Sequence, residues 1–241
     1  MATTATIENP FARTHADVSA VPAVVRALRP MTGYEEEALE HLTGEPNVAR
    51  VTNEILARCY VPPGHDWAAA LTIVHEMTVL ERDAAVVVLR ILSAGEDVAN
   101  EVACPRCAAQ NVARFRLGDL PIARASRSPR VAVEVALPSG GSASLRLPSA
   151  RDQEDLFDAR LASAAARKSF LLARVLQRLR DESGPFTFDA VHALPSRDRD
   201  AMEKALDGAL PELDLTMAAE CVSCRERFEH PFEVSRFFFR S

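Results

Sequence analysis

The sequence predicts an α+β fold, built from helices and short antiparallel strands or hairpins, in which two Cys-x-x-Cys turns form one shared site. Three observations lead to this prediction. Four of the five cysteines lie in two pairs, Cys104–Cys107 and Cys221–Cys224. A helical stretch and an extended run precede each pair. Alternating apolar residues at 131–137 and 143–147, separated by a Pro-Ser-Gly-Gly turn, predict a β-hairpin.

The two cysteine pairs have the spacing of metal-binding turns. Both thiolates of a Cys-x-x-Cys turn can bind one metal ion from the same side, and two such turns complete a tetrahedral zinc site. We therefore expect Cys104, Cys107, Cys221 and Cys224 to bind one Zn²⁺ in a zinc-ribbon-like site, with each turn forming a zinc knuckle. Two alternatives stay open at this point, namely a redox-active pair and disulfide bonds.

The regions around the two knuckles resemble each other and predict an internal repeat. Arg82-Asp83 precedes Cys104 by the same spacing that separates Arg199-Asp200 from Cys221. Each copy reads as a helix, a strand, a knuckle and a second strand. Each copy would supply half of the metal site, so neither half can complete the ligand shell alone.

The amino-acid composition excludes several classes of protein. The 241 residues are 48% hydrophobic, which is enough for one large domain or two small ones with a real core. The formal net charge of −6 argues against a general nucleic-acid-binding surface. No apolar run reaches the ~18 residues of a membrane helix. Residues 1–10 lack the pattern of a signal peptide, so we expect a cytoplasmic protein, whose thiols stay reduced.

Four segments are expected along the chain. Residues 1–22 are small and polar without a period, which is typical of a mobile tail. Residues 23–120 are expected to be a helical region with the first knuckle. Residues 121–148 are expected to be a linker, marked by two prolines, and the β-hairpin. Residues 149–241 are expected to be a second helical region with the second knuckle and an aromatic C-terminal tail.

Capping boxes mark the starts of several helices. Thr32 with Glu35, and Thr78 with Glu81, have the Ser/Thr-x-x-Glu spacing in which side chain and backbone bond reciprocally. The apolar residues of 47–60 fall on one helical face, so a helix is predicted there.

Three further features belong to these helical regions. Cys59 lies on the apolar face of the helix predicted at 47–60, which favours a buried core thiol. Ser149 opens a helical region with Asp152 in its first turn. A longer helix is predicted from Ala164 to Arg180, with an apolar face of leucines and a valine.

No motif indicates catalysis. His75-Glu76 begins like the His-Glu-x-x-His zinc protease motif, but Val79 stands where the second histidine is required. P-loop, Gly-x-Gly-x-x-Gly and Gly-x-Ser-x-Gly patterns are missing as well. We therefore expect a protein that is not an enzyme and has no small-molecule substrate.

Several short stretches, read in order, carry a family resemblance. They are Arg29-Pro30-Met31-Thr32-Gly33, Arg50-Val51-Thr52, Glu81-Arg82-Asp83, Cys104-Pro105-x-Cys107, the Leu-Pro-Ser turns at 147–149 and 194–196, Arg197-Asp198-Arg199 and the second knuckle. Together they resemble the family of T-even phage baseplate hub assembly chaperones, which also occurs in gene clusters for contractile injection systems. The second knuckle departs from the pattern, because Val222-Ser223 stands where a proline or a glycine-rich turn is usual.

The resemblance implies a non-enzymatic assembly role. The chain would be a zinc-stapled assembly chaperone or a structural baseplate component of a contractile, phage-tail-like injection system. Its partners would be baseplate or hub proteins, without nucleic acid, and it would act in the bacterial cytosol or within the assembled particle. The alternatives are a zinc-ribbon adaptor that binds nucleic acid or another protein, and a zinc enzyme.

The C-terminal run Phe237-Phe238-Phe239 is a candidate partner-binding element. Neighbouring residues of a strand point to opposite faces, so three consecutive aromatic side chains cannot all be buried on one side. Insertion into a groove on a baseplate partner would cover them. The alternative is that the tail folds back onto the chain's own core.

Three arginines lie next to the cysteines. Four thiolates on Zn²⁺ leave a net charge of about −2. We expect Arg106, Arg225 and Arg227, together with backbone N–H groups, to offset that charge.

Overall fold

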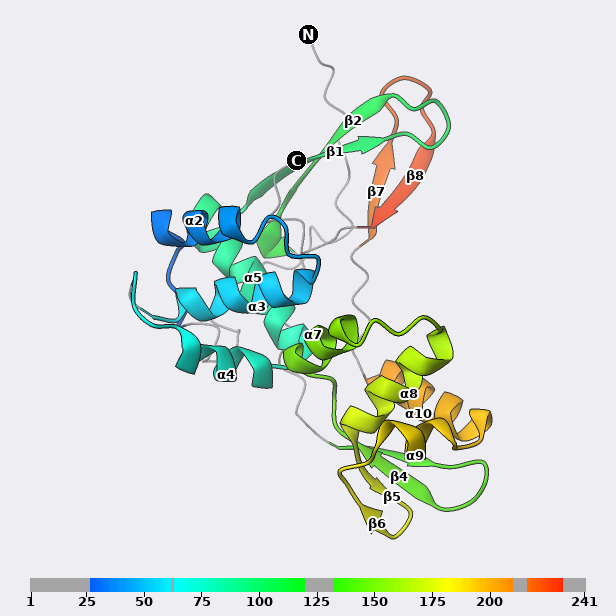
Figure 1. Cartoon of the computed structure of the whole chain (residues 1–241). Coiled ribbons are helices and arrows are strands. Elements are labelled where there is room, and N and C mark those ends of the chain that lie inside the picture. The colour runs from blue at the N-terminus through cyan, green and yellow to red at the C-terminus, as the bar shows by residue number, and fades with distance from the viewer. Residues whose placement is uncertain (1–26, 62, 120–131, 210–215, 232–241) are drawn as a thin grey trace.

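The computed structural model describes residues 27–61, 63–119, 132–209 and 216–231. These residues form helices and small antiparallel sheets, which confirms the α+β fold class. Helices α2 to α5 form one body and helices α7 to α10 a second one, and two β-hairpins lie together at one end of the molecule (Figure 1).

The elements follow one another in two series. The first is α2 (Gly33–His41), α3 (Val48–Cys59), α4 (Ala68–Glu76), α5 (Val79–Ala94), β1 (Asp97–Ala103), β2 (Gln110–Arg116) and the 3-10 turn η2 (Leu117–Asp119). The second is β3 (Val133–Ala136), β4 (Ser142–Leu145), α7 (Ala150–Asp158), α8 (Ala164–Val175), β5 (Leu176–Leu179), β6 (Glu182–Ser183), α9 (Phe188–His192), α10 (Ser196–Ala209), β7 (Thr216–Glu220) and β8 (Arg227–Pro231).

The predicted internal repeat extends over the helices of both bodies. Helices α2 and α7 begin at Gly33 and Ala150, which are 117 positions apart, as are the two knuckles. Helices α5 and α10 begin at Val79 and Ser196 with the same spacing. Helices α3 and α8 match with a spacing one residue shorter, because the connection before α8 lacks one residue. Within the described residues, the chain therefore shows two copies of one unit of four helices and a hairpin.

An arginine holds the first helix of the first copy. The Arg29 guanidinium donates to both Glu35 carboxylate oxygens at 2.8 and 2.9 Å, and to the carbonyl of Arg58 at 2.9 Å. Glu35 also accepts the Thr32 N–H at 2.9 Å, which completes the predicted capping box. Burial disfavours the charge on Glu35, but the bonds from Arg29 and Thr32 outweigh it and lower the pKa of this carboxyl to about 2.

The second copy repeats this arrangement with different residues. Arg146 binds the fully buried Asp152 carboxylate and donates to the carbonyl of Arg174 at 3.0 Å. Asp152 lies in the first turn after Ser149, as predicted, and accepts the Ser149 N–H at 2.8 Å in a capping box. It also accepts from Arg174 Nε at 2.8 Å. Burial opposes the charge, but these donors lower the pKa of Asp152 to about 2.

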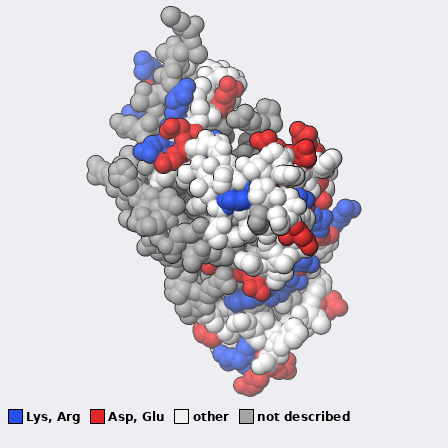
Figure 2. Space-filling view, turned by 90° about the vertical axis from the view of Figure 1, so that its left-hand side faces the viewer, with Lys and Arg blue, Asp and Glu red and all other residues white. Residues whose placement is uncertain are grey.

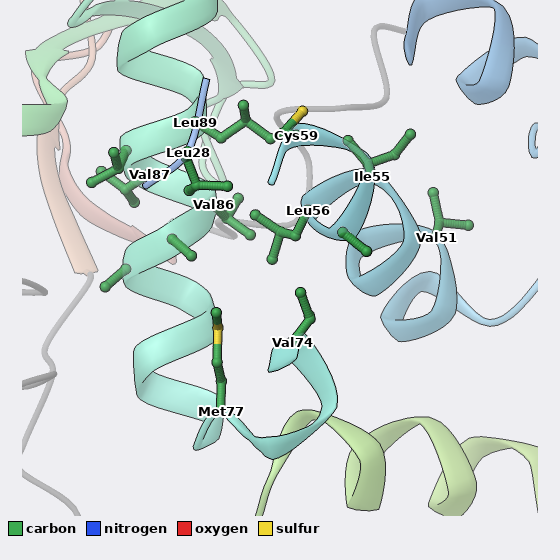
Figure 3. Close-up of a cluster of buried hydrophobic side chains, with 14 of the residues drawn as sticks. Leu28, Val51, Ile55, Leu56, Cys59, Val74, Met77, Val86, Val87 and Leu89 are labelled. Carbon is green, nitrogen blue, oxygen red and sulfur yellow. The ribbon is translucent and has the colours of Figure 1, made fainter. Parts of the chain in front are cut away.

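The core of the first copy lies between α3, α4 and α5 (Figure 3). Ile55 and Leu56 from α3 are fully buried, as is Leu89 from α5. Cys59 is fully buried in the same cluster, which confirms that it is a core thiol. Burial raises the pKa of the Cys59 thiol to about 12, so this cysteine stays neutral.

The second core is formed by a small sheet and its covering helices. The predicted hairpin is confirmed, since β3 and β4 pair antiparallel from Val133–Leu145 to Ala136–Ser142. β5 and β6 extend it to a four-stranded sheet in the order β3-β4-β5-β6. Apolar residues of α8, α9 and α10 pack against β4 and β5.

The prediction of one helix from Ala164 to Arg180 is wrong, because α8 ends at Val175 and β5 follows at once. A register shift between Ser144 and Leu145 places both Leu176 and Leu179, three positions apart, against β4. Both leucines therefore reach the core from a strand. A helical spacing of apolar residues fits either structure here, and pairing with β4 decides between them.

The two copies meet where α7 packs against α3 and α4. Glu154 of α7 is nearly buried there and accepts Asn53 Nδ2 at 2.9 Å and Arg50 Nε at 3.3 Å. Its carboxylate also lies 3.1 Å from His75 Nε2. His75 therefore contributes to the contact between the two copies. The zinc protease motif is incomplete at this site, because Val79 stands where its second histidine is required.

Candidate metal centre

The two knuckles are built alike, each closing an antiparallel hairpin in which the first cysteine bonds across the turn. Cys104 donates its backbone N–H to the carbonyl of Ala109 at 3.0 Å, and Cys221 donates to that of Glu226 at 2.8 Å. The hairpins β1–β2 and β7–β8 lie side by side, so cysteines distant in the sequence meet (Figure 1).

A left-handed residue ends each turn. Ala108 has φ 57° and Arg225 has φ 61°, and both backbone N–H groups donate to the carbonyl of the first cysteine of their knuckle. This conformation is uncommon for residues other than glycine. Its recurrence at equivalent positions indicates that the turn geometry, and not the side chain, is what the two knuckles share.

The structure brings all four predicted ligands together. The sulfurs of Cys104, Cys107, Cys221 and Cys224 all lie within 4.8 Å of one another. Cys104 Sγ is 3.7 Å from Cys224 Sγ, and Cys107 Sγ is 3.6 Å from Cys221 Sγ. Tetrahedral zinc with Zn–S bonds of about 2.3 Å places its sulfurs about 3.8 Å apart. The four cysteines can therefore hold one metal ion.

Backbone N–H groups favour a thiolate at the second knuckle. The Ser223 N–H donates to Cys221 Sγ at 3.4 Å. Hydrogen bonds from the N–H groups of Cys224 and then Ser223 lower the pKa of Cys221 to about 6. A deprotonated cysteine is the form that binds metal.

The three neighbouring arginines all pair with carboxylates. Arg106 donates to Glu226 at 2.9 Å and so connects the first knuckle to the second. This bond raises the pKa of Arg106, and the charges of Cys224 and Cys104 add to the effect. The other two arginines, Arg225 and Arg227, pair instead with Glu220 at 3.3 and 3.6 Å.

Asn111 is a structural residue of the site that the sequence analysis missed. It is almost fully buried, its Oδ1 accepts the Val222 N–H at 2.9 Å, and its Nδ2 donates to the carbonyl of Ala109 at 2.8 Å. One side chain thereby joins the two knuckles. The equivalent position of the second copy is Phe228, so the repeat pattern carries no signal for this contact.

Replacing Asn111 by alanine is expected to destabilise the protein by about 1–3 kcal/mol, because the N–H of the half-buried Val222 loses its acceptor. Arg106→Ala is the matched control, since its ion pair with Glu226 also connects the knuckles but is exposed to water and contributes little to stability. Denaturant unfolding of both variants, with metal content measured in parallel, checks this. Equal losses for the two variants would contradict the role given to Asn111.

Two other expectations concern the C-terminal aromatic run and membrane-spanning helices. The aromatic run Phe237–Phe239 lies outside the described residues. Among the residues that the structure describes, no helix has the length and apolar character needed to cross a bilayer.

The chain matches the model of a known protein family. A family model described as T4 bacteriophage base plate protein matches residues 17–239, which is most of the chain. Searches of curated proteins and of solved structures found no match.

Proposed function

Because the chain belongs to the family of T4 bacteriophage base plate proteins, we propose that it is a non-enzymatic assembly chaperone or structural component in the baseplate of a contractile, phage-tail-like injection system. Its partners are baseplate or hub proteins. The family match over residues 17–239 is the observation that carries this proposal. Specific co-purification of the full chain with baseplate or hub proteins, on co-expression with the tail genes, tests it.

The proposed metal is Zn²⁺, bound by Cys104, Cys107, Cys221 and Cys224. Four thiolates in tetrahedral arrangement form the ligand set of structural zinc. A shell filled by four cysteines leaves no position for a water or a substrate, which supports a structural and not a catalytic metal. The metal would join the hairpins of the two copies and so fix one half of the chain against the other.

The surface charge supports protein partners over nucleic acid. The chain carries a formal net charge of −6. On the face shown in Figure 2, basic and acidic side chains of the described residues are interspersed, without one broad basic stripe. Binding to nucleic acid relies on such a basic surface to contact phosphates.

Deletion of residues 236–241 is expected to abolish co-purification with the baseplate partner while the protein stays folded and keeps its metal. The physical reason is that the run Phe237–Phe239 would anchor the chain in a groove of the partner, as aromatic residues commonly do at interfaces. A matched control replaces Arg240 and Ser241 alone and leaves the aromatic run in place.

The outcomes separate the alternatives. A fall in melting temperature with loss of metal would mean that the tail belongs to the chain's own core. A truncated protein that is stable and still captures its partner would contradict both readings of the aromatic tail.

A further inference from the structure

The second copy carries an open version of the surface that binds α7 in the first copy. In the first copy, Asn53 and His75 contact the Glu154 carboxylate at 2.9 and 3.1 Å. Arg82 of the same surface hydrogen-bonds the side chain of Gln153. Three polar side chains from α3, α4 and α5 therefore bind the first two turns of α7.

The equivalent residues of the second copy are Ser169, His192 and Arg199, which we call the acceptor face. Ser169 Oγ accepts Arg199 Nη1 at 2.9 Å and lies 3.0 Å from His192 Nδ1. Ser169 is fully buried, as Asn53 is in the first copy. The acceptor face thus keeps the position and the cationic character of its counterpart.

The acceptor face is more exposed than its counterpart at its histidine, and it is incompletely bonded. The side chain of His75 is only 14% exposed under α7, whereas its counterpart His192 is an exposed residue. Arg199 Nε is buried and has no hydrogen-bond partner among the described residues. The equivalent region of the first copy is occupied by a carboxylate and an amide. A carboxylate is therefore the group that the acceptor face lacks.

Helix α2 is the counterpart of α7 and presents the missing carboxylates. Glu36 and Glu37 occupy the positions that Gln153 and Glu154 occupy in α7. Glu154 is buried between the copies, but Glu36 and Glu37 are exposed. Helix α2 packs on α3 with its other face, as α7 packs on α8.

We propose that two copies of this protein associate head to tail, with α2 of one copy docked on the acceptor face of the next. Glu37 then takes the place that Glu154 has within the chain. Its carboxylate lies beside His192, and Glu36, in the position of Gln153, pairs with the half-buried Arg199. The position of Arg50 is occupied by Ala166 in the second copy, so one cation is missing and this contact is weaker than the one inside the chain.

The backbone groups that bond α7 to the first copy have counterparts on the two surfaces that would meet between copies. Inside the chain, Val79 donates its N–H to the carbonyl of Pro148 at 3.2 Å, and Ala150 donates to that of Met77 at 2.8 Å. Between copies the equivalent bonds run from Ser196 N–H to the Met31 carbonyl, and from Gly33 N–H to the Leu194 carbonyl. The two ends of each chain are different surfaces, so the contact is heterologous and continues into a ring or a chain of copies.

Sedimentation velocity of the full-length protein over a concentration series tests the proposal. The wild type is expected to associate as its concentration rises, whereas Glu37→Arg and Arg199→Glu each remain monomeric. An equimolar mixture of these two variants is expected to associate again, because each variant supplies one intact surface and the two reversed charges are complementary. Glu101→Arg, with the same charge change on an exposed residue of β1, serves as the control and should associate like the wild type.

Circular dichroism establishes that each variant is folded. If Arg199→Glu does not fold, His192→Glu on the same face replaces it in the mixture. A wild type that stays monomeric throughout, variants that associate as the wild type does, or a mixture that does not associate would each overturn the proposal. A monomer that binds an acidic helix of another baseplate protein would assign the acceptor face to that partner instead.

Discussion

Replacing Cys104 by serine is expected to remove the metal and to destabilise the protein as severely as replacing Cys221. The two cysteines occupy equivalent positions in two knuckles that share one cluster of sulfurs. Structural zinc contributes about 10–16 kcal/mol in apparent terms to small zinc domains, and three cysteines retain only part of that affinity. Metal content and thermal unfolding of the purified variants measure the effect.

Cys59→Ala is the matched control, because Cys59 is the fifth cysteine and is buried in the helical core. It should cost a few kcal/mol for the cavity that it leaves, with the metal content unchanged. If Cys104→Ser kept its metal, or if it lost far less stability than Cys221→Ser, the shared site would be contradicted.

Replacing Asp152 by alanine is expected to cost about 3–5 kcal/mol, because a fully buried carboxylate paired with two arginines is removed. Arg146 and Arg174 are each about one-third exposed, so water takes over part of their solvation and favours the lower end. Glu35→Ala, the equivalent change in the first copy, should cost less, since only Arg29 is left unpaired. Glu36→Ala is the exposed control and should change the free energy of unfolding by less than about 0.5 kcal/mol.

The same two carboxylates predict a loss of stability in acid. The pKa values of Glu35 and Asp152 are about 2 in the folded protein, below the ordinary values of about 4. A lowered folded pKa gives stability that is present above pH ~4 and is lost as the pH falls towards 2. The double variant Glu35→Gln/Asp152→Asn should flatten the pH dependence between 2 and 5 in denaturant unfolding. An unchanged slope would contradict the role of these pairs.

Local signals in the sequence were sufficient for much of the fold. Capping boxes at Thr32 and Thr78 were identifiable because side chain and backbone bond within four residues. The cysteine spacing predicted the site for the same reason, since each knuckle is a short turn. The meeting of the two knuckles is a long-range contact, and only the need for four ligands predicted it.

Two elements were not predicted, for different reasons. Helix α4 begins at Ala68, after Trp67, whose side chain makes no capping bond, so the usual start signal is missing. The end of α8 at Val175 is set by the pairing of β5 with β4, which no local pattern of leucines reveals. A tertiary contact therefore decides where α8 ends.

The repeat was recognised only around the knuckles, although it covers both helical bodies. Glu35 and Asp152 have the same structural role but are different residues, as are Thr32 and Ser149. A one-residue difference before α8 shifts the rest of that helix. Residues that have the same role in the two copies differ in type and in spacing, so the structure reveals the repeat where a comparison of the two sequences does not.

The most direct test of the central claim, one structural zinc shared by two copies of a repeated unit, is metal analysis of the purified full-length chain combined with X-ray absorption at the zinc edge. We predict one zinc per chain with four sulfur ligands at about 2.3 Å. No zinc, two zinc ions per chain, or a shell that contains nitrogen or oxygen ligands would contradict the claim.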